Sequence, residues 1–496
     1  MKTKVLVVAA CCVSADVVHA QNSAPRVGSD VPRFAQSIAL EMVQLISSGD
    51  SAARARFVEK NFSAAGITNN GRDAQRIIKR LREQSGGVRL VSVERAGGNT
   101  FVTVHAPARQ RLALINMGWD GTDSTKLRLV EVLKAWNPRV DSIQWPEKRL
   151  PESALKSVIE ANVSRLAAAG GFSGTALVAH RGRIVFARGY GLANRDDSIA
   201  NSVSTRYATA SMGKMFTAVA IARLIEAGRL RLDDTLATIL PDYPNRERAR
   251  SITIRHLLGH TAGLGDIWSH PVFARGKAYS SNRELAWLIA DAPLLFTPGT
   301  KWSYSNEGYI VLGAVIEKVS GTSYEDYVRS RIFQPAGMTA TANAGNDEVV
   351  PHRAVGYRPS DDDVLVVEQL RPNWTFLGET SKASGAGGAY TTVTDLSRFV
   401  QALRAGKLLG SIRDTLWVGR SPLPWDASTK YGYGFMRSAV NGREFLGHGG
   451  GGGGSGMDNN MSFSADGDWT VIVLGNIDPP GASDLATRLV ALVSRQ

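Results

Sequence analysis

The chain has 496 residues, enough for roughly two or three domains, and its composition is that of an ordinary globular protein. The formal net charge is +13, but the basic residues are scattered rather than gathered in a long run. No nucleic-acid-binding motif accompanies this charge. The sequence therefore disfavours DNA or RNA as a partner and favours a setting near anionic polymers or membranes.

Residues 1–20 have the pattern of an export signal. Lys2 and Lys4 precede a short apolar core, and small residues lead up to a predicted cleavage site after Ala20. The apolar run is too short to span a bilayer, and no second long apolar run follows it. We therefore expect a periplasmic or secreted protein with no transmembrane span in its mature form.

Both cysteines of the chain, Cys11 and Cys12, lie within this predicted signal. Cleavage after Ala20 would leave no disulfide, no thiol nucleophile and no cysteine metal site. Residues 8–11 also resemble a lipoprotein cleavage box, so lipidation at Cys11 is an alternative.

Residues 31–136 are predicted to form a small α+β domain. Helical periodicity covers residues 32–49 and 50–62, and a third helix is predicted over residues 72–84. Alternating apolar residues then predict four strands, over residues 88–95, 100–108, 111–119 and 126–136. This order of elements, with the phrase SGDSAARARFVEKNFS, resembles nuclear transport factor 2-like domains. Such domains often hold a ligand pocket, but nothing here indicates a ligand, so a structural or dimerising role is favoured.

Residues 137–151 are predicted to be a linker, marked by the steps Asn137-Pro138 and Trp145-Pro146, and residues 152–496 are predicted to form the main domain. A helix over residues 152–169 and a hairpin over 174–191 are followed by a mostly helical middle. Strands return near the end, over residues 443–448, 460–465 and 468–476, before a last helix. We expect an α+β fold in which both ends of this region build one antiparallel sheet, flanked by helices, with a helical subdomain beside it.

The first chemical signal is Ser211 followed by Lys214, at the start of an Ala-rich helix that stops at Gly228. Residues three apart share one helix face, so the hydroxyl and the amine can meet. A desolvated amine next to a serine can act as its base. The same spacing occurs at Ser153 and Lys156, so the motif alone does not identify the site.

The second signal is Tyr304-Ser305-Asn306, which follows a turn and directly precedes a helix. A tyrosine phenol can relay a proton if neighbouring cations lower its pKa, and an amide can hold a lysine or a substrate. Tyr243 and Asn245 have the same spacing, so this motif too is ambiguous when it is taken alone.

The third signal is His448, which ends a predicted strand and leads into six consecutive glycines, residues 449–454. Glycine lets a substrate lie against a strand edge, where backbone N–H groups can stabilise an oxyanion. The alternative is a flexible linker. We favour the strand edge because the glycines lie between two strong strand patterns.

Because the three signals occur together in this order, the sequence resembles the family of serine β-lactamases and penicillin-binding-protein-like hydrolases. It is most similar to the branch that contains class C β-lactamases, esterases and D-aminopeptidases. The resemblance covers residues 152–495. It includes the phrases LLGHTAGL, PGTKWSYSNEGYIVLGAVIEKVSG, IFQPAGM and GAGGAYTTVTDLSRF, which are far more specific than the triplets. These surroundings are absent at the two decoy motifs.

The resemblance implies a role for each motif residue. Ser211 would be the acylated nucleophile, and Lys214 its base or the group that lowers its pKa. Tyr304 would be the proton relay, as the base for deacylation and the acid for the leaving group. Asn306 would hold Lys214 and the substrate. His448, Gly450 and Gly451, which belong to the third motif, would line the substrate site. The oxyanion hole would combine the backbone N–H groups of Ser211 and, in the usual register, Gly451.

His448 departs from the family pattern, in which a lysine usually begins the third motif. Histidine is mostly neutral near neutral pH, which disfavours an efficient β-lactamase and fits the esterase and aminopeptidase relatives better. We expect an exported, metal-independent serine hydrolase without a cofactor, acting on small-molecule or peptide-like esters or amides.

Several alternatives stay open. The chain could be a true β-lactamase, a DD-carboxypeptidase, a catalytically silent binding module, or a protein whose main role lies in its N-terminal domain. His256 and His260 are four residues apart but lack the glutamate of H-E-x-x-H, which argues against a zinc protease. His260 is instead expected to shape the loop beside the site.

Overall fold

The structure is a computed structural model that describes residues 25–96, 99–109, 111–136, 140, 142–265, 267, 279–345, 348–359, 370–373, 383–424 and 426–496. The predicted export signal and its cysteines lie outside the described residues, as does part of the predicted linker. Within the described ranges, no helix combines the length and the apolar character needed to cross a bilayer.

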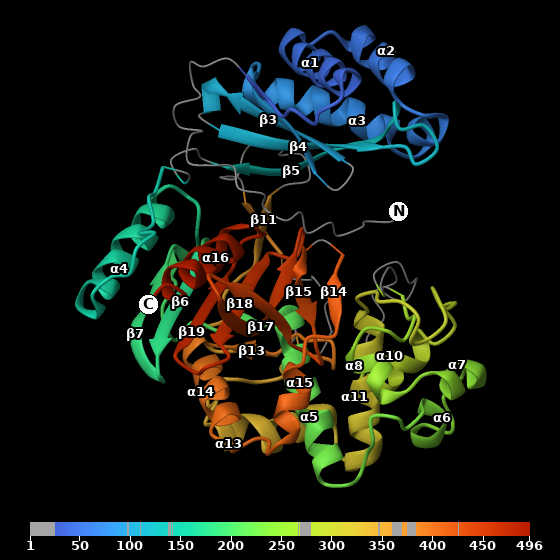
Figure 1. The fold of residues 1–496 in the computed structure, drawn as a ribbon, viewed down its shortest axis with the longest axis vertical. Coiled ribbons are helices and arrows are strands. Elements are labelled where there is room, and N and C mark those ends of the chain that lie inside the picture. Colours follow the sequence, from blue (N-terminus) through green and yellow to red (C-terminus); the bar gives the residue numbers. More distant parts are fainter. Residues whose placement is uncertain are drawn as a thin grey trace.

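The N-terminal part contains three helices followed by a sheet (Figure 1). The helices are α1 (Arg33–Ser48), α2 (Ser51–Asn61) and α3 (Ala64–Ser85). The strands are β1 (Arg26–Val27), β2 (Arg89–Ala96), β3 (Asn99–Ala106), β4 (Arg111–Trp119) and β5 (Leu127–Trp136). They lie side by side in chain order, antiparallel except for the pair β1 and β2.

Helix α3 begins eight residues before the predicted start at residue 72. Ser63 caps it, since its hydroxyl accepts a hydrogen bond from the N–H of Gly66 at 3.0 Å. Gly66 then packs so closely on β5 that a Cβ atom there would lie 2.5 Å from the carbonyl oxygen of Leu127. The cap at Ser63 and the close packing of Gly66 against the sheet therefore account for the earlier start of the helix.

One hydrophobic cluster joins the three helices to a single face of this sheet, with Ile38, Phe57, Ile78, Val104 and Ile115 among its buried members. Alternation along each strand explains why only one face contributes. The similarity of this part to nuclear transport factor 2-like domains, and its treatment as a separate domain, stay predictions.

The main sheet has eight antiparallel strands in the order β14-β15-β16-β17-β18-β19-β6-β7. They are β6 (Gly174–His180), β7 (Arg183–Tyr190), β14 (Ser421–Leu423), β15 (Asp426–Tyr431), β16 (Met436–Val440), β17 (Arg443–Gly452), β18 (Met457–Ser464) and β19 (Trp469–Gly475). Because β19 pairs with β6, both ends of the main region build one sheet, and the predicted fold class is confirmed.

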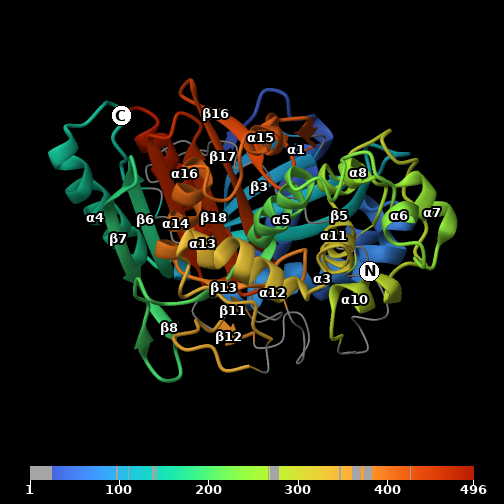
Figure 2. The ribbon, with the colours of Figure 1, turned by 90° about the horizontal axis from the view of Figure 1, so that it is seen from below.

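Helices cover both faces of this sheet (Figures 1 and 2). Helices α4 (Glu152–Ala168) and α16 (Gly481–Val493) share a cluster with Val471, whereas α5 (Lys214–Glu226) and α14 (Val393–Arg404) share another with Ile472. Adjacent strand residues thus face opposite layers.

The second layer continues into a helical subdomain beside the sheet (Figure 2). Its helices are α6 (Leu236–Ile239), α7 (Arg246–Ser251), α8 (Ile254–Leu258), α10 (Asn282–Leu288), α11 (Asn306–Ser320) and α12 (Tyr324–Val328). Two further helices are α13 (Gln334–Ala336), which contacts α14, and α15 (Ile412–Trp417), which contacts α5. The sheet and this subdomain meet at the start of α5.

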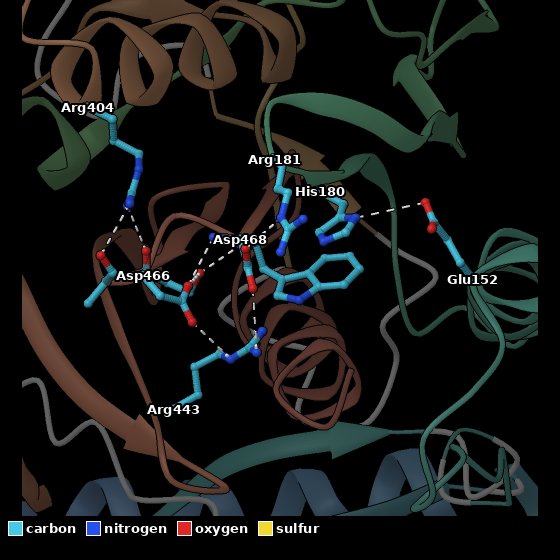
Figure 3. A network of polar contacts seen from close by, with 10 residues as sticks. Glu152, His180, Arg181, Arg404, Arg443, Asp466 and Asp468 are labelled. Atoms are coloured by element: carbon cyan, nitrogen blue, oxygen red, sulfur yellow. Dashed lines mark hydrogen bonds and ion pairs between the residues drawn. The ribbon is translucent and has the colours of Figure 1, made fainter.

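One end of the sheet carries a network of charged side chains (Figure 3). Arg443, the first residue of β17, lies 3.3 Å from the carboxylate of Asp466 and 3.8 Å from that of Asp468. Arg181 approaches Asp468 to 2.9 Å, and Arg404 donates to the backbone carbonyl of Ser464 at 2.8 Å. These contacts tie the β6–β7 and β18–β19 turns to the start of β17.

Candidate active site

Ser211 lies in a short 3₁₀ turn, Ala210–Gly213, that directly precedes α5, and Lys214 is the first residue of that helix. Side chains three residues apart eclipse one another in a 3₁₀ turn, so the geometry brings hydroxyl and amine together. Ala210 has a left-handed φ of 45°, which is uncommon for a residue with a side chain. Strain of this kind just before Ser211 is typical of functional turns.

Lys214 is fully buried, and its amine makes three hydrogen bonds. The Nζ atom lies 3.1 Å from Ser211 Oγ, 2.7 Å from Asn306 Oδ1 and 2.9 Å from the carbonyl oxygen of Ala386. All three partners are neutral, and together they fix the amine against the serine hydroxyl.

Tyr304 and Asn306 reach the same amine from the helical subdomain. Ser305 caps α11, accepting from the N–H of Gly308 at 3.0 Å, so Asn306 is the first residue of the helix. The Nζ atom of Lys214 lies 4.8 Å from the ring centre of Tyr304. The structure therefore brings together Ser211, Lys214, Tyr304 and Asn306, as the sequence predicted.

His448 lies on β17 and is buried. Its Nε2 atom is 3.1 Å from the hydroxyl of Tyr431, and its Nδ1 atom contacts the carbonyl oxygen of Gly449. A carbonyl can only accept, so Nδ1 carries the proton and Nε2 accepts from Tyr431. Burial, reinforced by the charge of Lys214, lowers the pKa of His448 to about 3, and the ring is therefore neutral near neutral pH.

The glycines after His448 continue β17, because Gly449 to Gly452 pair with residues 457–460 of β18. A Cβ atom at Gly450 would lie 2.3 Å from the carbonyl oxygen of Thr209 and 3.2 Å from the backbone nitrogen of Ser211. Gly451 has a φ of 123°, which favours glycine. The strand therefore packs directly against the serine turn, and the donation of an N–H by Gly451 to an oxyanion stays a prediction.

The edge of β17 that faces β16 is only partly paired. Strand β16 pairs with residues 443–447 of β17, and no described strand continues this pairing along His448 to Gly452. These residues leave a strand edge beside the serine turn, where backbone groups can bind an extended ligand.

The decoy motifs lie apart from this site. Ser153 and Lys156 are exposed on α4. Tyr243 is buried against Trp287, and Asn245 caps α7. The sequence phrases favoured Ser211 and Tyr304 over the decoys, and the fold places these two residues together at Lys214.

His256 and His260 each accept a backbone hydrogen bond, and their donors lie in two different segments of the chain. His256 Nδ1 accepts from the N–H of Thr253, and His260 Nδ1 accepts from the N–H of Ser305. Among the described residues, no three His, Cys, Asp or Glu side chains gather in a way that could hold a metal ion.

Two contacts of the site were missed at the level of sequence. Tyr431 binds His448, and the carbonyl of Ala386 binds Lys214. The available signals were the run YGYGF at residues 431–435 and the phrase that contains Ala386. Neither has a spacing that by itself indicates a contact with the motifs.

A buried lysine bound to a serine hydroxyl, between an antiparallel sheet and a helical subdomain, defines a class of penicillin-recognising folds. The family model described as beta-lactamase matches residues 159–495. The chain therefore belongs to the beta-lactamase family, and the resemblance drawn from its motifs is confirmed.

Relatives and solved structures agree with this assignment. The chain is 33% identical over 308 residues to the putative penicillin-binding protein PbpX of Bacillus subtilis (strain 168), covering 62% of this chain and 71% of that protein. A penicillin binding protein from Bacillus halodurans is similar with a TM-score of 0.57 and 30% identity, over 65% of this chain and 96% of that one. A D-stereospecific amidohydrolase from Streptomyces sp. has a TM-score of 0.54 and 26% identity, over 68% and 98% of the two chains.

Proposed function

We propose that this protein is an exported serine hydrolase that acts through an acyl-enzyme on ester or amide substrates. The observation that carries the proposal is the distance of 3.1 Å between Lys214 Nζ and Ser211 Oγ in a buried, fully hydrogen-bonded arrangement. An amine held against a hydroxyl in this way can take its proton as the oxygen attacks. Export rests on the sequence pattern of residues 1–20.

The proposed reaction has two halves. The cycle starts with Lys214 as the neutral amine: Ser211 Oγ attacks the carbonyl carbon, and its proton moves to Lys214. Tyr304 protonates the leaving alcohol or amine as the C–O or C–N bond breaks, and it regains a proton from Lys214. A water molecule then attacks the acyl carbon as its proton passes to Tyr304 and the proton of Tyr304 passes to Lys214. Ser211 leaves as the ester bond breaks and takes its proton back from Lys214.

The backbone supplies the remaining groups. The N–H groups of Ser211 and Gly451 are proposed to stabilise the tetrahedral oxyanion, and Asn306 keeps the amine oriented while contacting the substrate. The substrate would lie along the partly unpaired edge of β17, beside His448 and Gly450.

The neutral state of His448 favours substrates that have no carboxylate next to the scissile bond. A neutral ring engaged by Tyr431 offers no permanent cation for a carboxylate next to the scissile bond. This disfavours β-lactam antibiotics and DD-carboxypeptidase substrates, and it favours esters and amides that lack this carboxylate. The similarity to a D-stereospecific amidohydrolase supports amides of small, peptide-like compounds as candidates.

The direct test compares Ser211→Ala with Ser153→Ala in the purified protein. Both variants remove a hydroxyl from an S-x-x-K motif, but only the first lies in the site. We expect Ser211→Ala to lose turnover of aryl esters and of D-amino-acid amides, and Ser153→Ala to behave as wild type. Retained turnover in Ser211→Ala would overturn the proposal. A chromogenic cephalosporin in the same panel distinguishes β-lactamase activity from hydrolysis of open-chain esters and amides.

A further inference from the structure

His260 lies outside the three motifs, in the loop after α8, and is 1% exposed. Its backbone φ is 58°, in the left-handed region that residues with a side chain seldom adopt. Such a conformation persists only where the surroundings hold it, and it is often found at functional sites. The contacts of this one residue show what the conformation achieves.

His260 holds the chain on both sides of Tyr304. Its backbone carbonyl accepts a hydrogen bond from the N–H of Ser303 at 2.9 Å. Its Nδ1 atom accepts from the N–H of Ser305 at 3.1 Å. The left-handed backbone lets one residue direct both acceptors toward the same segment, which fixes the peptide groups before and after the tyrosine.

The imidazole ring also packs on the tyrosine itself. Its centre lies 4.4 Å from the ring centre of Tyr304, 4.5 Å from that of Tyr431 and 5.0 Å from that of Tyr309. Because Nδ1 accepts a backbone N–H, the ring proton lies on Nε2. Burial, with the charge of Lys214 nearby, keeps the pKa of His260 well below its usual range, so the acceptor on Nδ1 is preserved.

We propose that His260 is a positioning residue for Tyr304, which it holds against Lys214 through the two flanking backbone groups. This inference rests on the proposed function, in which Tyr304 transfers the proton. Without the side-chain acceptor, the buried N–H of Ser305 loses its partner and the segment is free to shift. Misplacement by about 1 Å reduces a proton-transfer step on the order of 100-fold.

The chemistry of the contact identifies a rescuing substitution. In asparagine, Oδ1 stands the same number of bonds from the backbone as Nδ1 does in histidine. Asparagine also tolerates the left-handed conformation better than other residues with a side chain. His260→Asn should therefore keep both contacts. His260→Leu removes the acceptor, and His260→Gln moves it one bond farther from the backbone.

The experiment compares these three variants with wild type, using an aryl ester for turnover and a fluorophosphonate to label Ser211. We expect His260→Leu to retain labelling while kcat falls on the order of 100-fold, and His260→Asn to stay within about 10-fold of wild type. A wild-type kcat in His260→Leu would overturn the proposal, as would equal losses in folded His260→Leu and His260→Asn. If His260→Leu does not fold, His260→Gln must be slower than His260→Asn, and equal rates would contradict the role.

A spectroscopic readout separates this inference from the proposed function. With 3-fluorotyrosine at position 304, we expect the fluorine resonance to move or broaden in His260→Leu and to return in His260→Asn. An unchanged resonance in His260→Leu would overturn the positioning role even if Ser211 proves catalytic. Conversely, turnover by Ser211→Ala at the wild-type rate would refute the proposed function. The fluorine resonance would still show whether His260 positions Tyr304.

Discussion

Arg443 and His448 stand five residues apart on β17, yet they occupy opposite electrostatic settings. The side chain of Arg443 is 21% exposed and lies within 4 Å of two carboxylates. Figure 3 shows how it points toward Asp466 and Asp468. His448 is 3% exposed and binds only neutral groups, the hydroxyl of Tyr431 and a backbone carbonyl. The same strand thus runs from a charged, partly exposed end of the sheet to a buried site with neutral contacts.

The difference shows where charge has consequences in this molecule. Ion pairs near solvent are screened and contribute little to stability. In a buried site a charge is costly unless it is held, and the same low dielectric strengthens its effect on reacting groups. The charge that Lys214 carries when it is protonated is stabilised by three neutral acceptors, whereas His448 stays uncharged. We therefore expect substitutions at the buried end to change chemistry and those at the exposed end to change little.

The largest effect is expected from Lys214→Ala. It removes the amine that lies against Ser211, and loss of a general base reduces kcat by on the order of 10³-fold. The matched control is Lys156→Ala, which has the same spacing from a serine but is exposed on α4. Steady-state hydrolysis of an aryl ester measures both, and equal rates in the two variants would place the base elsewhere.

Tyr304→Phe should have the next largest effect. It keeps the ring beside Lys214 but removes the hydroxyl that is proposed to carry the proton, with a loss on the order of 100-fold in kcat. Tyr243→Phe is the control, because Tyr243 belongs to the decoy motif and its buried hydroxyl has no hydrogen-bond partner among the described residues. Stopped-flow kinetics that show unchanged acylation and deacylation in Tyr304→Phe would rule out the relay.

A pH-dependent loss of stability should follow from His448. Its folded pKa of about 3 lies below the ordinary histidine value, so the unfolded chain binds the proton first as the pH falls. Stability is then full above the unfolded pKa and is lost below it, by about 2 kcal/mol between about pH 7 and about pH 5. Urea unfolding of wild type and His448→Gln tests this, since the variant should lose less over the same interval; identical losses would contradict it.

The smallest effect is expected at the exposed end of β17. Arg443→Gln removes a partly exposed member of the network in Figure 3, which should change the free energy of unfolding by less than about 1 kcal/mol. Turnover should equal that of wild type. Thermal unfolding at low and high salt measures the change in the free energy of unfolding. A large loss of activity in this variant would contradict the expectation that substitutions at the exposed end of β17 leave the chemistry unchanged.

Much of the main region could be predicted because its patterns are local. Alternation predicted the strands that became β17, β18 and β19. The long phrases elsewhere in the main region, one of which contains Tyr304, distinguished Ser211 and Tyr304 from the decoy motifs. The predicted strand at residues 443–448 was too short, because glycine gives no alternation to detect. The continuation to Gly452 depends on pairing with β18 and on contact with the serine turn.

Other features depend on contacts that no spacing encodes. The start of α3 was missed because Ser63 caps a stretch rich in glycine and asparagine. Tyr431 reaches His448 only because β15 and β17 flank β16 in the folded sheet. The two hydrogen bonds that His260 accepts from the segment around Tyr304 depend on a left-handed backbone at His260, which no sequence pattern predicts.

The central claim is that Ser211 becomes acylated, and mass spectrometry of the quenched enzyme tests it most directly. Wild-type protein is treated with a fluorophosphonate or a slowly hydrolysed ester and digested with trypsin, which releases residues 207–214 as one peptide. The account predicts that this peptide gains the mass of the acyl or phosphonyl group and that fragmentation places it on Ser211. Modification at another residue, or none in a folded and active enzyme, would contradict the account.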